Sequence, residues 1–214
     1  MEVQYFPPIE LDSRENYMIG LVEFFTWNSI PNIDETNNEF NIVNKGLIQV
    51  PTGSYELDDI PKILIDESNK KGVTLDIKVN KNTLRTEVKC SHDLDFGWLN
   101  SIGQVFGFKQ QVLKRNRRHL SDNPAVISKV NALRVECNIA TGSYINDKKV
   151  HTIHQFVPTV PPGYKIIEVP SNIIYSPVGV HTISDIQLQI VDQLGNFIDF
   201  RGEPITVRLH IKSV

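Results

Sequence analysis

The stretch ITVRLHIK, residues 205–212, alternates aliphatic and polar side chains without a break. Ile205, Val207, Leu209 and Ile211 occupy the odd positions, and every residue between them is polar. Successive side chains of a β-strand point to opposite faces, so this pattern is typical of an antiparallel strand with one face on a core and one in water. It predicts a protein built from half-buried strands.

The same alternation recurs along the chain. It is clear in residues 73–79, 133–139 and 186–190, and turn-forming residues such as Asn80 and Gly195 follow two of these rows. Further strands are expected at residues 17–27, 40–50, 151–157, 164–169 and 172–175. About nine to ten short strands at this spacing favour an all-β sandwich or barrel over a parallel sheet alternating with helices.

Two segments break the alternation. Asp58 and Pro61 precede residues 62–69, and Gly72 follows them, which predicts a short helix that begins at a capping carboxylate and ends at a glycine. Residues 99–108 predict a second helical turn. We expect one or two short helices inserted in a β-sandwich.

Composition sets further bounds. The chain has 214 residues, of which 40% are hydrophobic and 22% charged, with a net charge of -3. We expect one soluble domain over residues 15–214, preceded by an arm of residues 1–14 that reaches a neighbouring protein or is a frayed end. The sequence has no apolar run long enough for a membrane span and no signal peptide. Two cysteines fit a reducing compartment.

Catalytic and cofactor motifs are missing from the sequence. It contains neither GxGxxG, GxxxxGK[ST] nor GxSxG. His151 and His154 are three residues apart, so on a strand they point to opposite faces and do not share a metal ion. Asp58 and Asp59 precede the helix and are expected to cap it. We therefore predict no enzyme, no cofactor and no metal.

Cysteine and tryptophan side chains are assigned to the interior. Cys90 and Cys137 fall on the apolar phase of their strands, which predicts small buried hydrophobes rather than reactive thiols. Trp27 and Trp98 are interpreted as core anchors, because indole rings bring a large apolar area to a packed interior.

One local charge cluster departs from the acidic average. The cations of this basic run gather between residues 109 and 119: Lys109, Lys114, Arg115, Arg117, Arg118 and His119. Clustered cations gain free energy by releasing counterions from a phosphate backbone, which would make Lys114, Arg115, Arg117 and Arg118 a contact to nucleic acid or to another protein, or a nuclear-import signal. The alternative is a solvated loop.

Two apolar loops are candidate interfaces. Phe106 and Phe108 form one of them, and Val157 and Val160 belong to the other. Uncovered apolar residues mark contact surfaces, and the alternative is a small core beneath each loop.

Several phrases of the sequence resemble a known family. They are GLVEFFTWNSIPN at residues 20–32, PTGSYEL at 51–57, RVECNI at 134–139 and QLQIVDQLGNFIDFRGEPI at 187–205. Together they resemble the minor capsid, or penton, proteins of Polinton (Maverick) elements and adintoviruses, over about residues 11–212.

The resemblance implies a single jelly-roll domain of eight strands with added strands. It implies a homopentamer at the five-fold vertices of an icosahedral capsid, in a shell made by a separate double jelly-roll major capsid protein. It further implies a place in the virion, and in the host cytoplasm or nucleus during assembly. Some related adenovirus pentons carry an integrin-binding RGD loop; residues 201–203 read RGE here, so integrin binding is not carried over.

A second function class stays open at this point. A β-sandwich binding module for carbohydrate or protein would use Trp27, Trp98 or Tyr144 as a stacking surface, and acidic loops to hold calcium. An enzyme ranks below both, because no nucleophile, base and orienting group can be assembled from the spacing.

Overall fold

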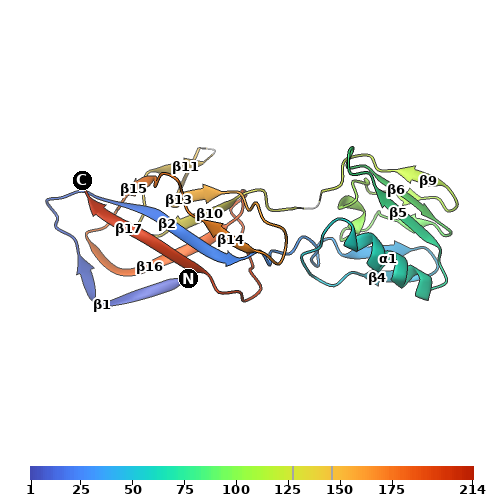
Figure 1. Cartoon of the computed structure of the whole chain (residues 1–214), viewed down its shortest axis with the longest axis horizontal. Helices are drawn as coiled ribbons and strands as arrows, with labels where there is room; N and C mark the ends of the chain where they lie inside the picture. Colours follow the sequence, from blue (N-terminus) through green and yellow to red (C-terminus); the bar gives the residue numbers. More distant parts are fainter. Residues whose placement is uncertain (127, 146) are drawn as a thin grey trace. The chain divides into compact units, whose positions relative to one another are not determined.

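The computed structural model describes residues 1–126, 128–145 and 147–214. Antiparallel strands dominate it (Figure 1), and the predicted all-β class is confirmed. The chain divides into unit 1, Met1–Asn28 with Val130–Val214, and unit 2, Ser29–Lys129. The sequence analysis expected one continuous domain from residue 15. Alternation of side chains is a local signal, so it reveals strands without revealing which core each strand joins.

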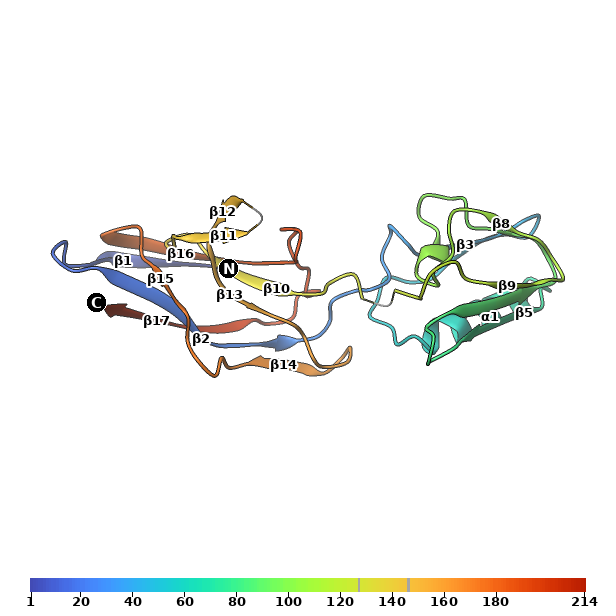
Figure 2. The ribbon, with the colours of Figure 1, turned by 90° about the horizontal axis from the view of Figure 1, so that it is seen from above.

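Unit 1 is a sandwich of two four-stranded antiparallel sheets. In the first, the strand order is β1 (Glu2–Glu10), β16 (Thr182–Val191), β10 (Leu133–Cys137) and β13 (Thr152–Phe156). In the second, β2 (Tyr17–Trp27) is central, with β17 (Thr206–Ser213) along one side and β14 (Lys165–Glu168) and β15 (Tyr175–Pro177) along the other, as Figure 2 shows. The strands β11 (Ser143–Ile145) and β12 (Lys148–Val150) form a separate hairpin.

Aromatic rings join the two sheets of unit 1. The ring of Phe24 in β2 lies 5.3 Å from that of Phe156 in β13 and 6.4 Å from that of Phe200, centroid to centroid. All three side chains are buried, and each contributes about 1.5–3 kcal/mol by leaving water. The alternation of residues 205–212 is confirmed, because Arg208 and His210 face solvent while Leu209 and Ile211 are partly covered.

Unit 2 has a core of its own. One sheet contains β4 (Gly46–Gln49), β3 (Glu39–Ile42), β7 (Leu94–Asp95) and β8 (Val112–Leu113), and the other contains β5 (Leu75–Val79), β6 (Thr86–Cys90) and β9 (Arg118–Leu120). The helix α1 (Asp59–Lys70) and the 3₁₀ turn η1 (Ile102–Gln104) complete the unit. The rings of Phe40, Phe96 and Phe106 are fully buried in this core together with Ile60 and Leu64 of α1.

The predicted helix is confirmed with slightly wider bounds, and Gly72 follows it at φ +68°. Capping is different from the prediction. Asp58 occupies the N-cap position but its side chain makes no capping hydrogen bond. Its carboxylate lies 2.7 Å from the ammonium of Lys81, and that ion pair replaces the cap. Asp59 pairs with Lys62 at 2.9 Å within the first turn.

Two further segments differ from the sequence analysis. Residues 40–50 were expected as one strand, but they form the β3–β4 hairpin, whose turn places Asn44 at φ 64° and Gly46 at φ 89°. Residues 1–14, expected as an arm, include β1, which pairs with the edge of β16. Among the described residues, no helix is long and apolar enough to cross a bilayer.

Candidate functional site: the exposed surfaces of the two units

The basic run lies in unit 2 and is tied to acidic neighbours. The Lys114 ammonium is 3.2 Å from the Asp93 carboxylate, and the backbone N–H of Arg115 donates to Asp93 Oδ1 at 2.7 Å. Arg118 forms an ion pair with Glu87. The Arg115 hydrogen bond first, and Lys114 second, hold the pKa of the Asp93 carboxyl below its usual value. Part of the positive charge is therefore neutralised within the unit.

The outer face of the β5–β6–β9 sheet carries charges of both signs. Asp76, Lys89 and Arg118 lie opposite one another in one row, and Lys78 lies opposite Glu87 in another. A phosphate backbone is attracted by a surface of one sign, which this face does not offer.

Two cations of the basic run have a different environment. Arg115 and Arg117 are exposed, and no carboxylate of the described residues lies within ion-pair distance of either. The contact of the basic run with nucleic acid or a capsid protein stays a prediction. Of the four residues proposed for it, Arg115 and Arg117 are the two whose charge is available to a partner.

Phe106 and Phe108 do not form an exposed surface. Phe106 is 0% exposed and Phe108 is buried beside Phe96, with ring centroids 5.4 Å apart. The expectation of an exposed apolar loop is wrong here because the backbone folds tightly inward. Gly107 lies at φ +81°, and a Cβ there would meet the Asn123 carbonyl oxygen at 2.1 Å.

Val157 and Val160 lie in unit 1, in the connection from β13 to β14. Val157 is 59% exposed and Val160 is half-buried. The side chain of Asn28 donates a hydrogen bond to the Val160 carbonyl oxygen at 2.7 Å, which anchors this connection to the end of β2. The exposure that made these residues interface candidates is present, and their contact with another chain stays a prediction.

An apolar surface that the sequence analysis missed borders this connection. We call it the β2–β14 patch, and it contains the exposed side chains of Trp27 and Ile167. Trp27 is 43% exposed, so its interpretation as a core anchor is wrong. Ile167 lies opposite Phe25, two residues before Trp27, which places Ile167 and Trp27 on one face of the sheet. An apolar ring is found both in protein cores and at interfaces, so the residue type of Trp27 did not reveal which of the two it occupies.

Trp98 also departs from the core interpretation. It is 53% exposed, and its indole N–H donates to Asp95 Oδ2 at 3.1 Å. Tyr144, in the β11–β12 hairpin, is exposed as well. Both rings are exposed, as a stacking surface of a carbohydrate-binding or protein-binding module would require.

The histidines and cysteines have ordinary structural surroundings. His151 Nδ1 lies 2.6 Å from the Ala140 carbonyl oxygen, whereas His154 Nε2 lies 2.8 Å from Glu168 Oε1. Within the described part of the chain, no three His, Cys, Asp or Glu side chains are grouped as metal ligands. Cys90 and Cys137 are buried as predicted, and burial raises the pKa of both thiols.

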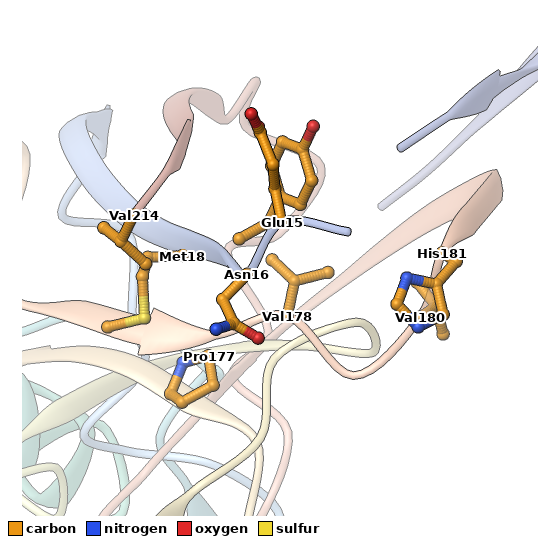
Figure 3. A pocket seen from close by; sticks show the side chains of 9 residues that line it. Glu15, Asn16, Met18, Pro177, Val178, Val180, His181 and Val214 are labelled. Carbon is orange, nitrogen blue, oxygen red and sulfur yellow. The ribbon is translucent and has the colours of Figure 1, made fainter. Parts of the chain in front are cut away.

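A hollow of about 390 Å³ lies in unit 1 where three distant segments meet. Residues 15–18, four residues between 177 and 181, and Val214 line it (Figure 3). Its polar side chains include Glu15 and His181, and the remainder is largely aliphatic. No sequence pattern marks this hollow, because its residues become neighbours only through folding.

No family model matches the chain, and no curated protein matches its sequence. Among solved structures, the crystal structure of selenomethionine-labelled mavirus penton protein matches with a TM-score of 0.53 and 12% sequence identity. The match covers 100% of this chain and 91% of that chain. The two chains share a fold. The penton-like jelly roll expected from the sequence is therefore confirmed at the level of the fold, and the match extends over both units.

Proposed function

We propose that the chain is a penton-type capsid protein that forms homopentamers at the five-fold vertices of an icosahedral capsid. The observation that carries the proposal is the fold match to the mavirus penton protein over the whole chain. A single shared domain is common among unrelated functions, but a match that covers 100% of a chain with two units is more restrictive.

The side-chain chemistry supports a structural role rather than a catalytic one. In the described residues, His151, His154, Asp58 and Asp93 each contact a structural partner instead of a shared reaction centre. Both thiols are buried with a raised pKa, which disfavours the thiolate that a nucleophile requires. The work of such a chain is to present shape and surface.

Ring formation requires a head-to-tail interface, in which two different surfaces of each copy meet. The β2–β14 patch, together with Val157 and Val160, is one surface that we assign to this interface. These residues are apolar, exposed or half-buried, and adjacent to one sheet end. Exposed apolar groupings of this kind are favoured in protein contacts.

The remaining assignments follow from the same proposal. A double jelly-roll major capsid protein is the neighbour around each vertex, and the source is a Polinton (Maverick) element or an adintovirus. The protein is then found in the virion, and in the host cytoplasm or nucleus during assembly. No membrane contact is part of this proposal, and nucleic acid is at most a weak partner through Arg115 and Arg117.

Sedimentation velocity and native mass spectrometry of the full chain test the proposal. We expect a mass five times 24.3 kDa and five-fold rings in electron images. If the chain stays monomeric, co-expression with the shell protein decides whether it enters capsid vertices. A monomer that is excluded from capsids, and that binds a glycan array through Trp98 or Tyr144, would establish the binding-module alternative instead.

A matched pair of variants locates the interface. Val157→Asp with Val160→Asp introduces charge on the assigned surface, whereas Leu120→Asp introduces it at an exposed apolar residue of unit 2. We expect the first variant to lose the pentamer and the second to keep it. Equal behaviour of the two variants would refute the assignment of this surface.

A further inference from the structure

The N-terminal strand β1 is poorly covered by its own chain. Eight of its nine residues are exposed, including Val3, Ile9 and the fully exposed Phe6. β1 is an edge strand, and β16 is its one ladder partner among the residues that the structure describes. The apolar side chains of β1 therefore gain little free energy of burial in the position they occupy.

The ladder between β1 and β16 is also interrupted. Residues 2–4 pair with residues 185–187, and residues 9–10 pair with residues 182–183, with a register shift between Gln4 and Ile9. Pro7 and Pro8 lie inside the interruption and have no N–H to donate. The same prolines disfavour the addition of a further strand to the outer edge of β1.

The edge of β16 is better formed than the strand on it. Ile183, Ile186 and Leu188 of β16 are buried, and this strand also pairs along its other edge with β10 in the core of unit 1. β16 accordingly presents a fixed row of backbone donors and acceptors, and the segment that fits this row in the structure is β1 itself.

A short polar hinge connects β1 to the body. Residues 11–16 join it to β2 and span at most about 20 Å when extended. An exposed ion pair between Asp12 and Arg14 and a hydrogen bond from Leu11 N–H to the His181 carbonyl oxygen hold the hinge. Exposed ion pairs contribute little, and short hinges favour exchange of a strand between copies over free folding back.

We propose that β1 is exchanged, so that β1 of each copy lies on β16 of the next copy in the ring. This inference rests on the proposed pentamer. Exchange keeps the ladder seen within one chain and also brings Val3, Phe6 and Ile9 between two bodies. Each copy donates one β1 and accepts one, which closes a head-to-tail ring with every β16 edge paired.

Disulfide formation between single-cysteine chains tests the exchange. Met1 and Leu188 exchange hydrogen bonds in both directions at 2.9 Å, so the next pair, Glu2 with Gln187, is a non-hydrogen-bonded pair. Directly opposite residues of this kind have Cα atoms about 4.5 Å apart, a spacing that a disulfide spans. The native thiols of Cys90 and Cys137 are buried and do not compete.

The Glu2→Cys chain is labelled with ¹⁵N, mixed as unfolded protein with unlabelled Gln187→Cys chain, refolded together and oxidised. Denaturing mass spectrometry should then show a disulfide dimer that contains one chain of each kind. The chain with both substitutions should form covalent multimers. An internal disulfide in that double variant, with no mixed dimer, would overturn the proposal, and so would the lack of any disulfide in either arrangement.

The pair Tyr17 and Ser213 supplies the matched control. The bond from Val214 N–H to the Asn16 carbonyl oxygen makes this neighbouring pair of β2 and β17 non-hydrogen-bonded as well. It lies directly after the hinge, inside the body of one chain. Tyr17→Cys and Ser213→Cys should link within one chain and not between chains.

The native mass, measured on the same samples, separates the two proposals. A five-copy mass with an internal Glu2–Gln187 disulfide would remove the exchange and leave the pentamer. A single-copy mass without mixed dimers would remove the exchange, and exclusion of the same chain from capsid vertices on co-expression with the shell protein would remove the pentamer as well.

Discussion

The two units dispose of their apolar side chains differently. They are similar in length, yet among the described residues 15 of the exposed large hydrophobic side chains belong to unit 1 and seven to unit 2. Unit 2 buries its phenylalanines in one core with the apolar side chains of α1, and pairs Lys114 and Arg118 of its basic run with carboxylates. Unit 2 buries most of its large apolar side chains, whereas unit 1 leaves more of them exposed to solvent. In the proposed pentamer, we therefore expect contacts between copies to be made mainly by unit 1.

The largest effect is expected in the core of unit 2. Phe106→Ala should lower the free energy of unfolding of unit 2 by about 3–5 kcal/mol, because it removes a fully buried ring and leaves a cavity. Trp98 is the tryptophan of unit 2, so its fluorescence in a Trp27→Phe background during urea unfolding reports on this unit.

Phe6→Ala is the matched control in unit 1. It removes the same ring from a fully exposed position and should change the stability by less than about 0.5 kcal/mol. If Phe106→Ala were as mild as Phe6→Ala, the burial of Phe106 would be contradicted and the original interface assignment would return.

The second effect concerns the β2–β14 patch. Trp27→Asp should weaken the association of copies by about tenfold to a hundredfold, since buried aromatic anchors contribute about 1.5–3 kcal/mol at interfaces. Dilution series in sedimentation velocity measure this. Trp98→Asp alters an indole of similar exposure in unit 2 and should leave the assembly intact. If both substitutions caused dissociation to the same extent, units 1 and 2 would contribute equally to the association of copies.

The sequence predicted strands better than it predicted their arrangement. The expected strand at residues 17–27 has the observed bounds of β2, and the helix at residues 62–69 lies inside α1. Both rest on local periodicity. Assignment of β1 and β2 to unit 1 depends on partners more than a hundred residues away, which periodicity does not encode.

The candidate site was harder to predict because an apolar side chain can be buried either in the core of its own chain or at an interface. Phe106 and Trp27 were interpreted as interface and core respectively, and the structure reverses both exposures. The type of a residue determines how much free energy is gained when its side chain is buried. It does not determine whether the side chain is buried by its own chain or by another one.

The third effect is a pH dependence in unit 1. Asp192 accepts hydrogen bonds from the backbone N–H groups of Leu194 and Asn196, at 2.7 and 2.9 Å, and from the Asn196 side chain. Burial raises the pKa of this carboxyl, but the hydrogen bonds outweigh burial and lower it overall. The charged form is therefore favoured by folding, and its contribution is present above about pH 4 and lost as the pH falls through the folded-state pKa.

Asp192→Asn should destabilise unit 1 by about 1–2 kcal/mol at pH 7, with a difference that shrinks on acidification toward pH 3. Urea unfolding, followed through Trp27 in a Trp98→Phe background, measures this difference at each pH. A difference that stays constant with pH would show that the charge of Asp192 is not what stabilises the turn.

The smallest effect is expected at the basic run. Because Lys114 and Arg118 are paired with carboxylates, unit 2 should bind duplex DNA with a salt dependence corresponding to no more than about two phosphate contacts. Fluorescence anisotropy over a range of salt concentrations measures the slope. A steep slope that Arg115→Ser with Arg117→Ser abolishes would instead make unit 2 a nucleic-acid surface.

The insertion of unit 2 between β2 and β10 sets the order in which the chain can fold on the ribosome. All residues of unit 2 are consecutive, so it can fold as soon as residue 129 has emerged. β2 is finished at Trp27, yet its first partner in the sheet, β14, begins only at Lys165. At about 5–20 residues per second, this central strand waits roughly 7–30 s for a neighbour. Translation therefore completes unit 2 first and leaves unit 1 unfinished until nearly the whole chain exists.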